Sequence, residues 1–410
     1  MRKYKRIKKC RSCGSKKLIP ILNLGKIYVS DFVATFSNRG KIPLELILCE
    51  DCNLLQLRHT TNPDLLYREY WYKSGINETI IADLKDIVSK VEDQIKLKEG
   101  DIVIDIGCND GTLLRSYKTK ELKLVGFEPA LNLIKEAKQG TTKIIPNYFS
   151  FKFYRRYFNE HKAKVVTSIA MFYDLSNPNK FVDDITKCLD KEGVWIIEMR
   201  YLPLMLQQND IGNCCHEHVE YYSLLSLKNL LERHGLEIFN VELNDVNGGS
   251  LRAYIRFKNT FPICPSVNAL IEKEKLVRLN TVEPYSQFAS RILRIKQEVY
   301  DFVKKEHDAG KRIFVYGAST KGNTMLQYFG IDHKLIEAAA ERDSRKFGMK
   351  TIATEIPIIS EEESRKKADY FLILPWHFLD AFIKREKEFL SSGGRFIVPL
   401  PEFKIMEVKK

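Results

Sequence analysis

Short apolar runs alternate with longer helical stretches through the middle of the chain. A helix is predicted from about Asn77 to Leu97, because apolar residues recur there at helical spacing. The apolar runs that follow are predicted to be buried strands of one sheet: 101–106, 124–128, 165–169 and 194–198. Strands that alternate with helices in this way build a parallel sheet with helices on both faces. We therefore predict an α/β fold with a doubly wound sheet.

A different pattern follows this alternation. Ser226 is predicted to cap a helix that ends at Gly235. Residues 237–243 and 250–257 then flank Asn247-Gly248-Gly249, which is typical of the turn in a β-hairpin. The sheet is therefore expected to end in an antiparallel hairpin.

The two ends of the chain carry their own patterns. Short strands are predicted near the N-terminus at 20–24, 43–48 and 54–57. The charged helical segment 266–309 is predicted to bridge to a smaller α/β unit with strands at 312–316, 370–374 and 395–400. Because 410 residues exceed what one hydrophobic core usually organises, we expect two or three domains.

The composition indicates a globular protein that binds anionic ligands. The chain is 44% hydrophobic and 11% aromatic, which argues against disorder. Its net charge of +13 is spread over lysines along the whole length, so nucleotide-linked small substrates are favoured over nucleic acid.

Several features bear on the compartment. The basic start, residues 1–9, runs into Cys10 without an apolar segment, so it is not expected to be a signal peptide. No window of 18 residues lacks charge, so no membrane span is predicted. Nine cysteines without an export signal indicate thiols in a reducing compartment, and we expect a cytoplasmic location.

Four cysteines are spaced as two Cys-x-x-Cys knuckles near the N-terminus. They are Cys10, Cys13, Cys49 and Cys52. Two such turns supply the four thiolates of a tetrahedral zinc site, whereas the alternative is a redox-active dithiol. Because cysteines would fill all four positions, the predicted zinc is structural and not catalytic.

The strand at 101–106 runs into a glycine-bearing turn. The spacing is Asp105-x-Gly107-x-Asn109-x-Gly111, and the dinucleotide pattern Gly-x-Gly-x-x-Gly is absent. The loop is similar to the S-adenosylmethionine loop of class I methyltransferases. One half of an NAD-binding fold is the weaker alternative.

Two residues at later strand ends extend this predicted donor site. Glu128 ends the strand at 124–128, where a carboxylate can accept both ribose hydroxyls of a nucleoside. Met171 and Phe172 follow the strand at 165–169 and are suitably apolar to pack on adenine.

Residues 213–222 concentrate groups that can transfer protons. If this segment is extended, His216 and His218 lie on one face and Glu217 on the other. Histidine changes charge near neutral pH, and a carboxylate can orient it and raise its basicity, so the pattern favours general base catalysis. A zinc pair, or two hydrogen-bonded histidines in a polar strand, are the other interpretations.

Two further loops are candidates for substrate contact. The aromatic stretch 67–75, which includes Tyr72, is expected either to line a substrate pocket or to form an apolar lid between domains. Residues 317–323 form a second strand-to-helix loop with a hydroxyl at Ser319 and an ammonium at Lys321, which suits a phosphate, although the order of a P-loop is absent. A second donor site there is not expected, because no strand-end carboxylate was identified.

Taken together, these motifs resemble the three-part sugar C-methyltransferases of deoxysugar biosynthesis. The resemblance covers nearly the full length in the same order. It rests on the cysteine pairs, the loop at 105–111, and the segments 171–175, 216–218, 248–252 and 316–322.

The resemblance implies an activity and a role for each residue. The family methylates a carbon, typically C3, of a nucleotide-linked 4-keto-6-deoxysugar through an enolate. By resemblance, His218 is the base, Glu217 and His216 orient it or support the enolate, and Tyr72 is the acid or proton relay. The residues expected to contact the substrate are Tyr222, Arg252, Ser319 and Lys321.

The resemblance also divides the chain. It implies a zinc-binding domain at 1–66, a class I methyltransferase domain at 67–260, and a helical linker with a Rossmann-like nucleotide-sugar-binding domain at 261–410. S-adenosylmethionine and structural zinc are the expected cofactors, a nucleotide-diphosphate sugar is the expected partner, and a monomer or weak dimer is expected. An O-methyltransferase of a sugar, or a zinc protein that binds nucleotide sugars without catalysis, are the alternative functions.

Overall fold

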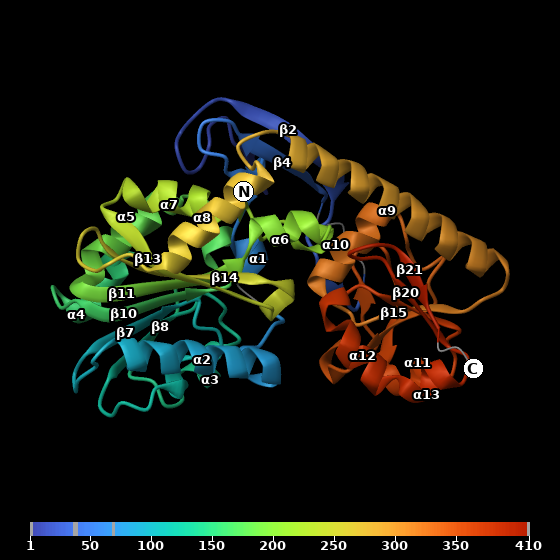
Figure 1. The fold of residues 1–410 in the computed structure, drawn as a ribbon. Helices are drawn as coiled ribbons and strands as arrows, with labels where there is room; N and C mark the ends of the chain where they lie inside the picture. The colour runs from blue at the N-terminus through green and yellow to red at the C-terminus, as the bar shows by residue number, and fades with distance from the viewer. Residues whose placement is uncertain (1–2, 36–39, 68–69, 408–410) are drawn as a thin grey trace.

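A computed structural model describes residues 3–35, 40–67 and 70–407 of the chain. Figure 1 shows three parts: a central sheet with its helices on the left, a second α/β unit on the right, and N-terminal strands above and between them. Within the described residues, no helix is long and apolar enough to cross a membrane.

The central sheet has seven strands in the order β13-β14-β11-β10-β7-β8-β9. β14 is antiparallel to both of its neighbours, and the remaining pairings are parallel. The strands are β7 (Ile102–Ile106), β8 (Lys123–Phe127), β9 (Lys143–Ile145), β10 (Ala163–Ile169), β11 (Leu189–Arg200), β13 (Leu236–Asn244) and β14 (Ser250–Phe257). The predicted doubly wound sheet and its closing hairpin are therefore confirmed.

Helices cover both faces of this sheet. In Figure 1, α5, α7 and α8 lie over one face, and α2 and α3 lie over the other. The helices of this part are α2 (Glu78–Gln94), α3 (Ile134–Ala137), α4 (Phe151–Phe158), α5 (Pro178–Cys188), α6 (Leu202–Gln207), α7 (Leu224–Glu232) and α8 (Pro265–Val277). Single 3-10 turns lie between them at η1 (Ser74–Ile76), η2 (Leu114–Ser116), η3 (Phe172–Asp174), η4 (Ile211–Asn213) and η5 (Val246–Gly248).

The predicted cap at Ser226 is wrong by three residues. Ser223 is the residue with extended backbone angles before α7, and its hydroxyl accepts a hydrogen bond from the Ser226 N–H at 3.1 Å. The Ser226 hydroxyl in turn accepts from the Ser223 N–H at 3.0 Å. Both serines therefore belong to one capping box, in which the first is the cap.

The N-terminal strands form a four-stranded sheet in the order β12-β5-β4-β2. Its members are β2 (Leu18–Ile27), β4 (Ile42–Cys49), β5 (Leu55–Leu57) and β12 (Glu220–Tyr221), and two further pairs of short strands are β1 (Tyr4–Arg6) with β6 (His59–Thr61) and β3 (Phe32–Val33) with β17 (Lys350–Thr351). The short helix α1 (Asp64–Tyr67) follows β6. We call residues 213–222 the histidine segment. Because β12 lies within it, the histidine segment is anchored to the N-terminal sheet.

The C-terminal part is a second parallel sheet, in the order β18-β16-β15-β19-β20-β21. Only β21 pairs antiparallel among these strands. The strands are β15 (Ile313–Tyr316), β16 (Ala338–Glu341), β18 (Ile358–Ser360), β19 (Tyr370–Ile373), β20 (Arg395–Val398) and β21 (Lys404–Met406). The helices and turns are α9 (Glu283–Asp308), α10 (Thr320–Phe329), η6 (Ser344–Lys346), α11 (Glu361–Arg365), η7 (Trp376–Phe378), α12 (Leu379–Arg385) and α13 (Lys387–Ser391).

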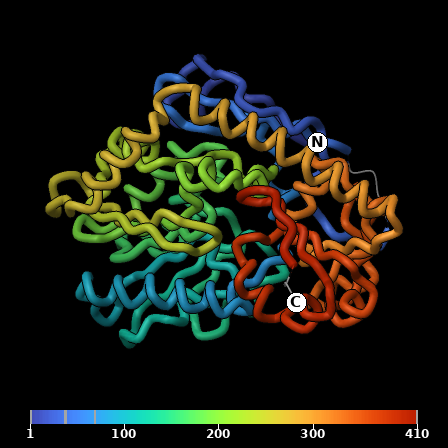
Figure 2. The backbone as a smooth tube through the Cα atoms, turned by 45° about the vertical axis from the view of Figure 1, so that its right-hand side comes forward, coloured from blue at the N-terminus to red at the C-terminus, as the bar shows by residue number. Residues whose placement is uncertain are grey.

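One hydrophobic core joins the N-terminal and C-terminal parts. It includes Leu46 of β4, Met205 of α6, Phe288 of α9 and Val315 of β15, and each is buried. Figure 2 shows the long helix α9 running beside the N-terminal strands. Burial of these side chains from distant segments holds the parts together and so fixes the space between them.

Candidate active site

One cavity of about 640 Å³ lies where the three parts meet. Its walls include Gly107 after β7, His218 in the histidine segment, and Ser319 at the start of α10. The cavity therefore connects the loop predicted to bind the methyl donor with the loop predicted to bind phosphate.

The loop after β7 is shaped for close approach of a ligand. Gly107 has a φ of +74°, and a Cβ atom there would lie 3.3 Å from the Cγ atom of Met171. Asn109 also has a positive φ, of 52°, which asparagine tolerates better than most residues. Met171, Gly107 and Asn109 all line the cavity, so the predicted donor residues come together here.

Two carboxyl groups flank this loop. Burial raises the pKa of Asp105 to about 7, although the Thr167 hydroxyl donates a hydrogen bond to its carboxylate at 2.6 Å. Burial also raises the pKa of Glu128 to about 7. The Glu128 carboxylate accepts hydrogen bonds from the backbone N–H groups of Asn109 and Ala130, each at 2.8 Å. Glu128 is thereby fixed at the end of β8 with its side chain facing the cavity.

Two residues expected to contact the methyl donor do not line the cavity. Gly111 does not line the cavity, and a Cβ atom there would lie 3.0 Å from the carbonyl oxygen of Ala137. This glycine therefore allows the loop to pack against α3. Phe172 is fully buried in the core beside Trp195 and Tyr222, so the expectation that it packs on adenine is wrong.

The aromatic stretch folds over the donor loop. The side chain of Asn109 donates to the carbonyl oxygen of Tyr72 at 3.2 Å and accepts from the N–H of Ser74 at 3.0 Å. Tyr70, Tyr72 and Ser74 line the cavity, and Tyr72 is 43% exposed. The stretch thus contributes to the pocket wall, while its residues Arg68 and Glu69 lie outside the described residues.

The histidine segment is bent, so the expectation of a shared face is wrong. Nδ1 of His218 lies 3.0 Å from the Asn213 carbonyl oxygen, and its ring meets the Tyr173 ring edge-on at 4.4 Å between centroids. His216 points elsewhere, with Nε2 3.1 Å from the carbonyl oxygen of Ile42 in β4. Only His218 of the two lines the cavity.

The protonation state of His218 follows from its surroundings. Because a carbonyl oxygen only accepts, Nδ1 carries the hydrogen and Nε2 keeps a free lone pair. Burial, with a smaller effect of the Lys321 ammonium, lowers the pKa of His218 to about 3. The imidazole is therefore neutral near pH 7 and able to accept a proton at Nε2.

Two carboxyl groups accompany His218, one within its segment and one in the preceding turn η3. Burial raises the pKa of Glu217, and its Oε2 atom is buried without a hydrogen-bond partner among the described residues. Asp174, at the end of η3, lines the cavity and has a similarly unpartnered Oδ1 atom. Tyr173 and Asp174 were not named as site residues from the sequence, although they lie in the segment 171–175 that carries part of the resemblance.

The structure does not support Tyr222 as a substrate contact. It is 1% exposed, its hydroxyl donates to the Glu220 carboxylate at 2.8 Å, and it does not line the cavity. A large aromatic side chain at this position fills the core instead.

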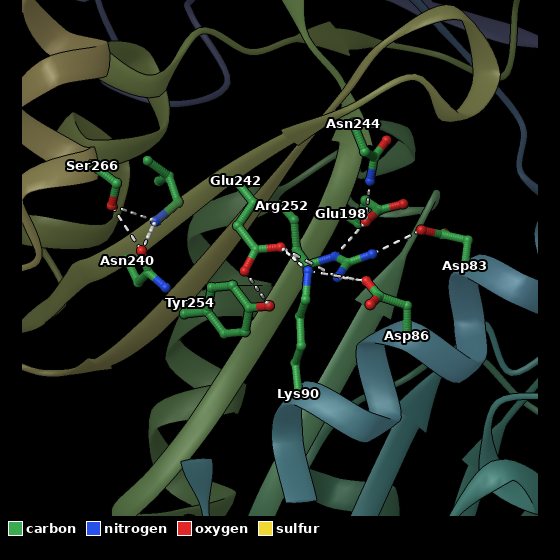
Figure 3. A network of polar contacts seen from close by, with 11 residues as sticks. Asp83, Asp86, Lys90, Glu198, Asn240, Glu242, Asn244, Arg252, Tyr254 and Ser266 are labelled. Atoms are coloured by element: carbon green, nitrogen blue, oxygen red, sulfur yellow. Dashed lines mark hydrogen bonds and ion pairs between the residues drawn. The ribbon is translucent and has the colours of Figure 1, made fainter. Parts of the chain in front are cut away.

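Arg252 is likewise buried and turned away from the cavity. Its guanidinium contacts Asp83 at 2.7 Å, Asp86 at 2.6 Å and Glu198 at 2.6 Å, with Glu242 at 3.5 Å (Figure 3). All its donors therefore face carboxylates of α2, β11 and β13. Two of these partners, Asp83 and Glu198, do line the cavity, so Arg252 supports its wall from behind.

The predicted phosphate loop opens onto the same cavity. The Ser319 hydroxyl caps α10 by accepting from the Gly322 N–H at 3.0 Å, and the Lys321 ammonium lies 3.3 Å from the side-chain oxygen of Asn213. Ser319 and Lys321 both line the cavity. The expected absence of a strand-end carboxylate is wrong, because Glu341 ends β16 and accepts from the Ala318 N–H at 3.1 Å.

The four N-terminal cysteines converge as predicted. The sulfur atoms of Cys10, Cys13, Cys49 and Cys52 all lie within 4.8 Å of one another. The sulfur atoms of Cys10 and Cys52 are 3.6 Å apart, and those of Cys13 and Cys49 are 3.5 Å apart. Both distances are far beyond a disulfide bond of about 2.05 Å and near the roughly 3.8 Å between thiolates around a tetrahedral zinc ion. The donor set fits a structural zinc ion, with no position left for a reacting ligand.

Comparison with known families covers nearly the whole chain. A zinc binding domain model matches residues 10–67, a methyltransferase domain model matches residues 76–241, and a model of the C-methyltransferase C-terminal domain matches residues 245–401. C-methyltransferase NovU from Streptomyces niveus is 29% identical over 410 residues, with 98% of each chain covered.

Other relatives match less than half of the chain. The tRNA U34 carboxymethyltransferase of Campylobacter jejuni subsp. doylei is 27% identical over 157 residues, which are 34% of this chain and 50% of that protein. A solved S-adenosylmethionine-dependent methyltransferase from Clostridium acetobutylicum ATCC 824 is 14% identical, with a TM-score of 0.34, and covers 43% of this chain and 92% of that chain.

The fold, the donor loop and the zinc site define a class: an S-adenosylmethionine-dependent methyltransferase with a structural zinc site. Within this class, the chain belongs to the three-domain C-methyltransferase family, whose parts it matches in order from residue 10 to residue 401.

Proposed function

We propose that this C-methyltransferase acts on a nucleotide-linked 4-keto-6-deoxysugar and methylates C3, the carbon beside the ketone. The observation that carries the proposal is the single cavity shared by the donor loop, His218 and the start of α10. An acceptor that spans this cavity needs a reactive centre beside His218 and an anionic group at α10. A nucleotide-diphosphate sugar has both features.

The donor end is assigned to residues around the loop after β7. The Glu128 carboxylate would accept hydrogen bonds from the ribose hydroxyls of S-adenosylmethionine. The rest of the S-adenosylmethionine molecule would contact Asp105, Gly107, Asn109 and Met171. When bound, S-adenosylmethionine supplies a methyl group on a positively charged sulfur atom.

The acceptor end is assigned to α10. The N–H groups at the start of this ten-residue helix, the Ser319 hydroxyl and the Lys321 ammonium suit a diphosphate. The net charge of +13 favours an anionic substrate in the same way.

His218 is the proposed base. Its neutral Nε2 would take the proton from C3, which the neighbouring ketone makes acidic. Burial and, to a smaller extent, the Lys321 ammonium lower the pKa of His218, so a diphosphate that neutralises Lys321 would make the imidazole more basic when the substrate binds. Tyr72, on the donor side of the cavity, stays our proposed acid or proton relay. We propose no direct catalytic part for His216, because it hydrogen-bonds to the carbonyl oxygen of Ile42 and does not line the cavity.

Mass spectrometry of reactions with S-adenosylmethionine tests the proposal. A panel of nucleotide-linked 4-keto-6-deoxysugars should gain one methyl group, and the matched 4-hydroxy sugars should not. Lys321→Ala should raise the KM of the nucleotide-linked sugar, because the diphosphate loses a charged partner. Methylation of the 4-hydroxy sugars at the same rate would contradict the proposal.

A further inference from the structure

The 3-10 turn η3 connects the donor loop with the proposed base. Met171, just before it, packs against Gly107, while the Tyr173 ring contacts the His218 ring. The Tyr173 carbonyl also accepts a hydrogen bond from the Val219 N–H at 3.0 Å. Its last residue, Asp174, lines the same cavity as Gly107 and His218.

Asp174 is a carboxyl group in the cavity wall with unused hydrogen-bonding capacity. Its Oδ1 atom is buried and has no hydrogen-bond partner among the described residues. Leaving such an atom unpaired is unfavourable, because it loses its hydrogen bonds to water and gains none in return. A buried polar atom on the wall of a substrate cavity therefore points to a ligand that completes its hydrogen bonding.

The surroundings of Asp174 favour its protonated form. Burial raises the pKa of Asp174 well above its usual range, and the nearby Glu217 carboxylate raises it further. The groups that act on it from the packed elements are Tyr67, Tyr70, Tyr173, Cys215, Glu217, Glu220, Tyr221 and Lys321. A hydrogen bond from Tyr67 and the Lys321 ammonium lower the pKa of Asp174, but both effects are smaller than those of burial and Glu217. Lys321 is the only cation among these groups, and a bound diphosphate would neutralise it. Asp174 therefore keeps its proton, and with it a hydrogen-bond donor.

We propose that Asp174 is a catalytic residue whose protonated carboxyl group donates a hydrogen bond to the ketone oxygen of the acceptor. The inference rests on the proposed function, since it requires a ketone. Asp174 then stabilises the enolate oxygen, and Glu217 is a positioning residue that keeps Asp174 protonated.

In the proposed step the C3–H bond of the sugar breaks, and its proton goes to Nε2 of His218. The electron pair forms a carbon–carbon double bond, and the π pair of the ketone moves onto its oxygen. Asp174 stabilises that oxygen by its O–H group, as a buried carboxylic acid kept neutral can do.

Hydrogen exchange at C3 measures this step without methyl transfer. In heavy water, with S-adenosylhomocysteine in place of the donor, the wild-type enzyme should exchange the C3 hydrogen of a nucleotide-linked 4-keto sugar. Asp174→Ala should slow both exchange and methylation by about 10²–10³-fold, the usual loss for one oxyanion donor. Its affinity for S-adenosylhomocysteine should stay within about twofold. Asp93→Asn, on the exposed face of α2, is the matched control and should behave as wild type.

The pH dependence of the methylation rate distinguishes a catalytic Asp174 from one that only supports the structure. In the wild type, the rate should fall as pH rises through the raised pKa of Asp174, because the ionised form no longer donates. Asp174→Asn keeps an N–H donor that does not ionise, so it should lose less activity than Asp174→Ala and should lack this alkaline decline. Glu217→Gln should move the decline to lower pH.

Two outcomes overturn the inference on its own. One is wild-type exchange that persists in Asp174→Ala, and the other is an alkaline decline that Asp174→Asn leaves in place. If the wild type exchanges no 4-keto sugar above the enzyme-free rate, the proposed function fails, and this inference fails with it.

Discussion

At the scale of single residues, the environments of Glu128 and Glu341 allow a sharp test of the donor site. Each of these glutamates lies at the end of the second strand of its parallel sheet. Each accepts a hydrogen bond from a backbone N–H of the glycine-bearing loop that follows the first strand. Glu341 also binds the Lys346 ammonium at 3.0 Å and does not line the cavity.

Glu128→Ala should weaken binding of S-adenosylhomocysteine in calorimetry by about 1.5–3 kcal/mol, because the ribose hydroxyls lose a charged acceptor. Glu341→Ala should leave this affinity unchanged. With its pKa raised to about 7, Glu128 is protonated below that pH, so affinity should increase as pH rises through about 7. Glu128→Gln should flatten this increase. Equal losses in Glu128→Ala and Glu341→Ala would refute the assignment.

The two histidines should differ in what they affect. His218→Ala should reduce turnover by roughly 10²–10⁴-fold while donor binding is kept, because it removes the proposed base. His216→Ala should instead lower the melting temperature, since it loses the hydrogen bond to Ile42. Turnover and thermal melting of both variants check this, and a His216→Ala protein of normal stability without activity would reverse the roles.

Residue spacing predicted some of these contacts and missed others for a physical reason. Asp105, Gly107 and Glu128 were identified because a strand end fixes where its next residues point. Tyr222 and Arg252 were assigned wrongly, since spacing does not show which way a side chain turns once it packs. Asp174 was missed because a helix of a single turn is too short to show a periodic pattern, so the sequence does not indicate which of its side chains face a cavity.

At the scale of elements, the Arg252 cluster connects α2 with the sheet (Figure 3). Arg252→Met should destabilise the protein by about 3–5 kcal/mol, because the two buried carboxylates of Asp83 and Glu198 lose their counter-charge. Arg294→Met, which breaks an exposed pair with Glu298, should cost under about 0.5 kcal/mol. Urea unfolding compares the two, and similar midpoints would argue against a structural role for the cluster.

Long periodic elements were the most predictable part of the fold. The strands of the central sheet, the hairpin and α2 all appear near their expected positions. The two-residue strand β12 and its pairing with β5 were not expected, because so short a segment carries no periodic signal. The bend just before β12 was missed for the same reason, and with it the different partners of His216 and His218.

At the scale of the whole molecule, the zinc site supports the N-terminal sheet that packs on α9. A Cys10→Ser/Cys49→Ser variant should lose about one zinc ion per chain and unfold this sheet at lower temperature. Cys264→Ser, outside the cluster, should keep its zinc. Metal analysis with thermal melting measures both, and full zinc content in the double variant would exclude these ligands.

The cavity itself depends on all three parts, which no single motif predicts. Sequence order indicated the donor loop, the histidine segment and the phosphate loop separately. Their meeting follows from burial between β4, α9 and β15, which is a property of the folded chain. The domain boundaries at 66 and 260 stay predictions.

The most direct test of the central claim locates the transferred methyl group. The enzyme is incubated with S-adenosylmethionine labelled with ¹³C in its methyl group and with a nucleotide-linked 4-keto-6-deoxysugar, and the product is examined by NMR. We predict that the labelled carbon is bonded to C3, with loss of the C3 hydrogen. A labelled methyl group on a sugar oxygen, or at a carbon remote from the ketone, would contradict the account.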